Sequence, residues 1–257
     1  MKHLAKIVIL ALTLSAATCF AQKADPEPVS GKTLTRNFVN RSLVYPDDDL
    51  AAGKSGKVVI AFHIDEKGKT SNISIAQTFS DEAAQTALDI FRKIEWAPAS
   101  TDGIAVATDF QYEIAFNAKS YKRSLKKRID LPLTHPADTS YKTYDYRNTD
   151  ERAYPYFGDG TNMGSYITHN MNYPAEAKQR EITGTVKLSF IVECDGNISN
   201  IEVTNHVGGG CDNEAIRLIE GTRWMPAVKD GKYVRTRNTQ DISFNIGAHN
   251  FIDGSSY

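Results

Sequence analysis

Apolar and polar residues alternate in the second half of the chain, which is the pattern of a β-strand with one buried face. Every second residue of this stretch is apolar: Val186, Leu188, Phe190 and Val192. Asp195-Gly196 follows and is a two-residue hairpin signal, because glycine adopts a positive φ without steric cost. A return strand is predicted after this turn from a second set of apolar residues: Ile198, Ile201 and Val203.

Helical patterns lie on both sides of this hairpin. Apolar residues at helical spacing precede Tyr173-Pro174, and good helix formers occupy 175–180. After a run of three glycines, Asp212 is the expected N-cap of a further helix. That helix has an apolar face formed by Ala215, Leu218 and Ile219. A last strand is predicted after the turn Asp230-Gly231, over 234–246.

The same pattern occurs a second time upstream, at a constant distance of 128 residues. Tyr45-Pro46 corresponds to Tyr173-Pro174 in this repeat. Further identical pairs are Gly68 and Gly196, Trp96 and Trp224, and Asp102-Gly103 and Asp230-Gly231. Roughly twenty of about seventy aligned positions are identical without a gap, which indicates an internal repeat. The sequence therefore predicts two homologous domains.

Each copy predicts an α+β fold: a short antiparallel sheet, made of the hairpin and the final strand, covered by two helices on one face. The predicted domains are 33–118 and 163–248, joined by a linker over 119–162. The linker is rich in tyrosine, and we interpret these side chains as packing against the domains rather than as an aromatic recognition strip. A short basic run at 122–128 is interpreted as solvated linker rather than as a binding patch.

The first 21 residues have the pattern of a signal peptide. Lys2 and Lys6 precede a short apolar core, and Cys19-Phe20-Ala21 places small residues before a cleavage site after Ala21. This predicts an exported, periplasmic protein with no stable transmembrane anchor once the peptide is cleaved. Cys194 and Cys211 then lie in an oxidising compartment, but the predicted hairpin separates them too far for a disulfide between them.

Composition and motifs argue against several functional classes. The formal net charge of −1 provides no overall field to attract nucleic acid. Gly53-Lys54-Ser55 resembles the end of a phosphate loop, but the required earlier glycine is Asp48. None of the mature histidines has metal-ligand spacing: His63, His135, His169, His206 and His249. We therefore expect no catalytic residues, no metal and no cofactor.

The motifs of the second copy resemble those of the C-terminal domain of TonB-family energy transducers. They are Tyr-Pro-x-x-Ala from Tyr173, Gly184-Thr185-Val186, the Gly-Gly-Gly-Cys-Asp run from Gly208, and Trp-x-Pro-Ala from Trp224. The first copy is recognisable but degraded, since Asp47-Asp48-Asp49 replaces Ala-Glu-Ala. Its last strand also lacks counterparts of Arg235 and Arg237.

The resemblance implies a periplasmic domain that binds extended segments of outer-membrane receptors or transporters by β-strand addition. The implied partner-binding residues are Tyr173, Pro174 and Lys178 with the strand Val234, Arg235, Thr236, Arg237, Asn238 and Thr239. The alternative for this strand is an edge that its arginines protect and that binds no partner.

Two other functions remain open from the sequence. One is a membrane-anchored energy transducer for uptake, if the N-terminal segment is retained as an anchor. The other is a structural envelope protein that forms homodimers through the same edge strand. The short tether between the apolar segment and the first domain reaches some 70 Å at most, whereas a TonB-like transducer has a long spacer.

Overall fold

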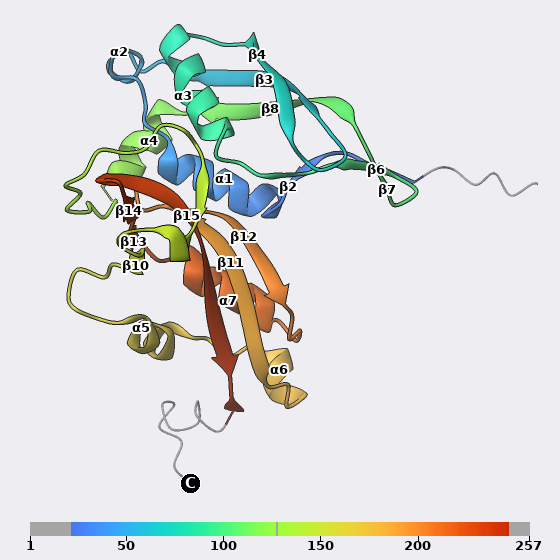
Figure 1. The fold of residues 1–257 in the computed structure, drawn as a ribbon, viewed down its shortest axis with the longest axis vertical. Helices are drawn as coiled ribbons and strands as arrows, with labels where there is room; N and C mark the ends of the chain where they lie inside the picture. Colours follow the sequence, from blue (N-terminus) through green and yellow to red (C-terminus); the bar gives the residue numbers. More distant parts are fainter. Residues whose placement is uncertain (1–21, 127, 247–257) are drawn as a thin grey trace, which may run out of the picture.

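The computed structural model describes residues 22–126 and 128–246, so the predicted signal peptide at 1–21 lies outside the described residues. Two domains lie one above the other in Figure 1, with helix α1 (Gly31–Ser42) between their sheets. Among the described residues, no helix combines the length and apolar character that crossing a membrane requires.

The first domain is built on a three-stranded antiparallel sheet. Its strands are β3 (Gly56–Ile64), β4 (Thr70–Gln77) and β8 (Thr108–Phe116), in the order β4-β3-β8. The helices of this domain are α1, α2 (Asp47–Ala51) and α3 (Asp81–Phe91). Helix α4 (Ala118–Leu125) comes directly after β8 in the chain. The short strands are β1 (Lys23–Ala24), β2 (Glu27–Pro28), β5 (Trp96–Ala97), β6 (Ala99–Thr101) and β7 (Ile104–Val106).

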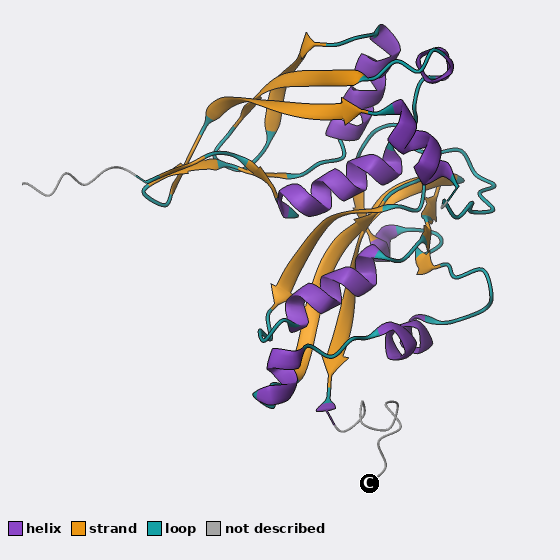
Figure 2. Ribbon diagram, turned by 180° about the vertical axis from the view of Figure 1, so that it is seen from behind, coloured by secondary structure: helices purple, strands orange, loops and turns teal. Residues whose placement is uncertain are grey.

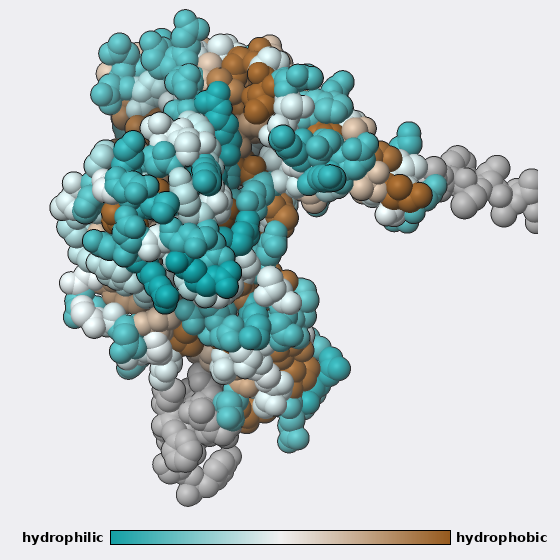
Figure 3. Space-filling model, viewed as in Figure 1, coloured by the Kyte–Doolittle hydropathy of each residue, from teal (hydrophilic) through white to brown (hydrophobic). Residues whose placement is uncertain are grey.

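Strands β1, β6 and β7 form an arm that projects from the first domain. Ile104 on this arm is 70% exposed, and Figure 3 shows apolar surface near the end of the arm.

The second domain repeats this arrangement, as Figure 2 shows from behind. Its main strands are β11 (Gly184–Val192), β12 (Ile198–Asn205) and β15 (Lys232–Phe244), in the order β12-β11-β15. Its helices are α5 (Met163–Asn170), α6 (Ala175–Gln179) and α7 (Cys211–Glu220), and its short strands are β13 (Trp224–Met225) and β14 (Ala227–Lys229). The predicted α+β class with two tandem domains is confirmed.

Two local predictions were wrong. The connection between β11 and β12 has five residues, 193–197, rather than two, and it is closed by Glu193 N donating to Asn197 O at 2.9 Å. Gly210, at φ 87°, is the N-cap of α7 instead of Asp212. The Asp212 carboxylate accepts from Val207 N at 2.9 Å, so it holds the glycine-rich loop that leads into the helix.

Each domain has its own core, and the two tryptophans mark equivalent positions. Trp96 packs against Phe62 with ring centroids 4.9 Å apart, and Trp224 packs against Phe190 at 5.2 Å. Fully burying one such large side chain stabilises a fold by about 1.5–3 kcal/mol. The alternating apolar residues that predicted the strands are thus the residues that form the cores.

The second sheet differs from the first because it is buried on both faces. Along β3 buried and half-exposed residues alternate, whereas all residues from Leu188 to Val192 on β11 are buried. Helix α1 of the first domain packs against β12, and Leu34 on this helix joins the second core. The first domain therefore covers the face of the second sheet that a lone domain would expose.

The linker adds structure to the second domain. It forms β9 (Thr143–Asp145), the 3₁₀-helix η1 (Tyr146–Asn148) and β10 (Tyr154–Pro155). β10 pairs with β13 as β2 pairs with β5, so the lead-in to each copy follows the same path. Tyr141 donates to Asp89 Oδ1 at 2.7 Å beneath the guanidinium of Arg92, which supports packing rather than recognition for this tyrosine.

Candidate peptide-binding edge

Strand β15 is paired on both of its edges for part of its length. β11 pairs with it antiparallel, from Val192 opposite Thr236 to Gly184 opposite Phe244. β9 pairs with it in parallel, over 143–145 opposite 235–237. Because Thr236 and Arg237 have partners in both strands, β9 must lie on the edge away from β11. The linker thus supplies an additional strand on the edge that was predicted to bind a partner.

The linker meets the same strand slightly earlier. Tyr233 N donates to Pro136 O at 2.9 Å, and Asp138 N donates to Tyr233 O at 2.8 Å. Backbone groups of a strand point alternately to its two edges. The backbone groups of Arg235, Arg237 and Thr239 therefore point the same way as those of Tyr233, toward the outer edge.

The outer edge is open beyond Arg237. In the part of the chain that the structure describes, no strand pairs with 238–244 on that side. A hollow of about 510 Å³ lies where β9 leaves the edge, lined by residues that include Asp145, Arg147 and Thr239. Seven residues of edge follow, which is the length of an ordinary strand.

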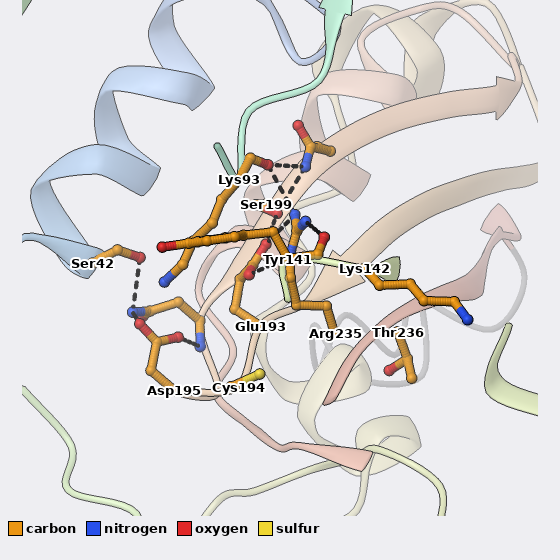
Figure 4. A network of polar contacts seen from close by, with 12 residues as sticks. Ser42, Lys93, Tyr141, Lys142, Glu193, Cys194, Asp195, Ser199, Arg235 and Thr236 are labelled. Atoms are coloured by element: carbon orange, nitrogen blue, oxygen red, sulfur yellow. Dashed lines mark hydrogen bonds and ion pairs between the residues drawn. The ribbon is translucent and has the colours of Figure 1, made fainter. Parts of the chain in front are cut away.

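Arg235 lies at the centre of a buried polar network between the domains, shown in Figure 4. Its Nε donates to Glu193 Oε2 at 2.8 Å and its Nη2 to Glu193 Oε1 at 2.9 Å. Nη2 also donates to Lys93 O of the first domain at 2.9 Å, and Nη1 to Tyr141 O of the linker at 2.7 Å. The side chains of Arg235 and Glu193 are only 6% and 0% exposed.

Arg237 also joins the two domains. Its guanidinium forms an ion pair with Glu95 of the first domain at 2.6 Å, in a half-exposed position. The interpretation of both arginines as charges that protect an exposed edge was therefore wrong. Both arginines bond strand β15 of the second sheet to the first domain.

The other predicted strand residues are mostly enclosed. Val234 pairs with Ala227 of β14, and Val234, Thr236 and Asn238 are all buried. Only Thr239 is both exposed and beyond the end of β9.

The predicted residues of the Tyr-Pro helix lie at the opposite end of β15. Tyr173 is buried, donates to Ile182 O at 2.7 Å, and packs its ring 5.7 Å from that of Phe244. Pro174 lies against the loop before α7, because a Cβ added to Gly210 would be 3.1 Å from it. Lys178 is exposed on α6. Thr239 and Phe244 are five residues apart, about 17 Å along the strand, so the structure does not bring the two groups of predicted residues together.

Sequence reasoning missed Glu193, Asn200 and the linker strand. The Asn200 amide donates to Lys93 O at 2.8 Å and accepts from Glu95 N at 2.8 Å, which holds the backbone of the first domain. The equivalent Asn72 has the same backbone conformation, φ 50°, but it is exposed and lines a surface hollow of the first domain. For the contact of Arg235 with the first domain, the sequence signal was a difference between the two copies. The first copy has Ala107 at the position equivalent to Arg235.

Two observations describe the metal-binding and thiol chemistry of the described residues. Among residues 22–126 and 128–246, no group of three or more His, Cys, Asp or Glu side chains could hold a metal ion. Cys194 and Cys211 are both free thiols. Burial, with the nearby Glu193 carboxylate, raises the pKa of the Cys194 thiol to about 11, which keeps it protonated and weakly nucleophilic at neutral pH.

Comparison with known proteins supports the resemblance seen in the motifs. A family model described as Gram-negative bacterial TonB protein C-terminal matches residues 41–118 and again 169–246, together more than half of the chain. Both predicted copies are thus matched separately. A search of curated protein sequences found no match.

Proposed function

We propose that this chain, which belongs to the Gram-negative TonB protein C-terminal family, binds extended segments of outer-membrane receptors or transporters in the periplasm. The family has a transport-associated, non-enzymatic role that depends on protein interaction. The proposed mode is β-strand addition, in which main-chain hydrogen bonds give affinity and neighbouring side chains give selectivity.

The observation that carries this proposal is β9. An extended segment already lies on the outer edge of β15, in parallel register with 235–237. The same edge continues over 238–244 with no strand beside it among the described residues. A peptide that adds to this stretch extends an existing sheet rather than creating a new one.

The proposed site combines main-chain and side-chain contacts. Val234, Arg235, Thr236 and Arg237 belong to the covered part of the edge, and Asn238 and Thr239 to the start of the open part. Tyr173 stabilises the far end of β15 through Phe244, while Pro174 and Lys178 belong to the helix that follows it. A peptide along the open edge would run from the hollow beside Thr239 toward this end.

Proline at Thr239 tests the strand assignment. The Thr239 N–H points to the outer edge, so Thr239→Pro removes a donor that β11 does not use, and proline is tolerated on an edge. One net hydrogen bond contributes about 0.5–1.5 kcal/mol, and the proline ring also obstructs the strand beside it. We therefore expect peptide affinity to fall by about tenfold or more.

Fluorescence anisotropy with labelled peptides from the periplasm-facing segments of outer-membrane receptors measures this effect. Thr239→Val is the matched control, because it removes the hydroxyl and keeps the N–H, and it should bind as the unmodified protein does. Equal affinity for Thr239→Pro and Thr239→Val would show that the peptide does not pair with this edge.

The periplasmic location is tested by the first residue of the mature chain. Mass spectrometry of the N-terminus of the native protein should find a chain that begins at Gln22.

A homodimer formed through the same edge would compete with the peptide. Sedimentation velocity should then show dimers dissociating as peptide is added, whereas dimers that resist saturating peptide use another surface.

A further inference from the structure

We propose that the linker segment 136–148 is an internal ligand that closes the peptide-binding edge and must be displaced before a partner can occupy all of it. This inference concerns the regulation of the proposed site and therefore rests on the proposed function. Its direct evidence is the path of the linker along β15.

The segment follows β15 as an added strand would. It is bonded to Tyr233 through Pro136 O and Asp138 N, and it pairs with 235–237 through β9. Between these two contacts it leaves the edge and returns, so the ladder is short and interrupted. A continuous peptide across 233–243 could form more main-chain hydrogen bonds than the linker does.

Both domains hold the segment in place. The Tyr141 carbonyl accepts from Arg235 Nη1 at 2.7 Å, and the Tyr141 hydroxyl donates to Asp89 of the first domain at 2.7 Å. The guanidinium of Arg92, also in the first domain, lies 5.4 Å from the Tyr141 ring centroid. Removing the segment from the edge therefore breaks contacts to the first domain as well.

The end of β9 is fixed by a turn. Asp145 Oδ1 accepts from Arg147 N at 2.9 Å, and the two side chains form an ion pair at 2.6 Å. The chain then turns into η1 and away from the edge. The three paired residues are thus bounded by the Tyr141 contacts on one side and by this turn on the other.

The first domain shows that the closure is specific to the second. Among the described residues, its equivalent strand β8 pairs with β3 alone, and no strand of the linker pairs with the other edge of β8. Ala107 stands where the second domain has Arg235. Protection of an exposed edge against aggregation would apply to β8 as much as to β15. Because β8 has no such cover, edge protection alone does not explain β9.

The expected effect is a lower apparent affinity in the intact chain. A tethered segment acts at an effective concentration that can reach the millimolar range. The apparent affinity of a competing peptide equals its intrinsic affinity multiplied by the fraction of molecules in which the edge is open. Releasing β9 should therefore tighten binding by about tenfold or more.

Two variants of the full chain test the inference. The released variant carries Thr143→Gly, Tyr144→Ser and Asp145→Gly, which removes the strand and its turn while keeping the linker length. The locked variant carries Tyr144→Cys and Thr236→Cys, which are paired across β9 and β15. Neighbouring strands lie about 4.7–4.9 Å apart, within the range that a disulfide spans.

The main probe is a labelled synthetic peptide of residues 139–149, which contains the β9 sequence. It should bind the released variant and show at least tenfold weaker binding to the unmodified protein and to the oxidised locked variant. A control with Asp159→Gly and Thr161→Ser, at a linker turn outside every strand, should behave as the unmodified protein does. Absence of binding to a folded released variant would overturn the inference.

Receptor-derived peptides separate this inference from the proposed function. If they bind no variant while the 139–149 peptide binds the released one, the internal ligand stands and receptor binding at this edge is refuted. If they bind the oxidised locked variant as tightly as the released one, β9 does not regulate the site. Should the released variant fail to fold, binding to the locked variant before and after reduction decides the question, and no gain on reduction would refute the inference.

Discussion

Replacing Arg235 by alanine leaves the Glu193 carboxylate without its cation in a place that water does not reach. The two side chains form two hydrogen bonds, at 2.8 and 2.9 Å, and are 6% and 0% exposed. Ser199 Oγ, which donates to Glu193 Oε1 at 2.5 Å, is the remaining partner in the network. A hydroxyl cannot replace a guanidinium, so the buried carboxylate is left without a compensating charge.

The expected magnitude follows from this burial. Breaking a buried ion pair by removing one partner costs about 3–5 kcal/mol. The substitution also removes the bonds from Arg235 to Lys93 O and to Tyr141 O, at 2.9 and 2.7 Å. Single domains have a total stability of about 5–15 kcal/mol, so Arg235→Ala should remove a large share of the stability of the second domain and loosen its contact with the first.

Urea unfolding followed by tryptophan fluorescence measures this loss. The two tryptophans lie one in each domain core, so a Trp96→Phe background leaves Trp224 as the reporter of the second domain. Arg237→Ala is the matched control, because its ion pair with Glu95 is half exposed. An ion pair of that kind contributes only about 0–1 kcal/mol.

A small effect would refute this reasoning. One such result is that Arg235→Ala lowers the free energy of unfolding by less than about 1 kcal/mol, or by no more than Arg237→Ala does. The buried carboxylate of Glu193 would then not need Arg235 as its counter-charge. The double replacement of Arg235 by methionine and Glu193 by leucine provides a further check. It should recover most of the stability, because a buried ion pair can be replaced by apolar side chains at little cost.

Three further predictions concern the domain contact, the turns and the thiol. Asn200→Ala should make the linker more sensitive to limited proteolysis, since Asn200 holds the backbone of the first domain at two points, whereas Asn72→Ala should leave it unchanged. Gly196→Ala should lower the urea midpoint more than Gly231→Ala. Both glycines have φ above 70°, but only at Gly196 would a Cβ lie 2.3 Å from a backbone oxygen. Cys194, with its pKa raised to about 11 by burial, should be alkylated at pH 8 roughly a hundredfold more slowly than an exposed cysteine. Its rate should rise steeply between pH 8 and 10, because the thiolate fraction grows tenfold per pH unit below the pKa, and a flat profile would contradict the shift.

The sequence alone determined the domain architecture, because the relevant interactions are local or repeated. Val186, Leu188, Phe190 and Val192 all lie in the second core, as their alternation requires. Gly68 and Gly196 both adopt a positive φ and lie beneath the carbonyl of Trp96 or Trp224. Equivalent residues recur 128 positions apart, and the two copies therefore fold into the same order of elements.

The tertiary structure alone decided which part of the edge is open. An arginine in a terminal strand gives the same sequence signal whether it faces water or pairs with a buried carboxylate 42 residues away, as Arg235 does with Glu193. β9 has three residues, too few for an alternating pattern to predict a strand. Its pairing depends on where the first domain and Tyr141 hold the linker. Local patterns determine which segments form strands, but only the packing of the two domains determines which strand edges remain available to a partner.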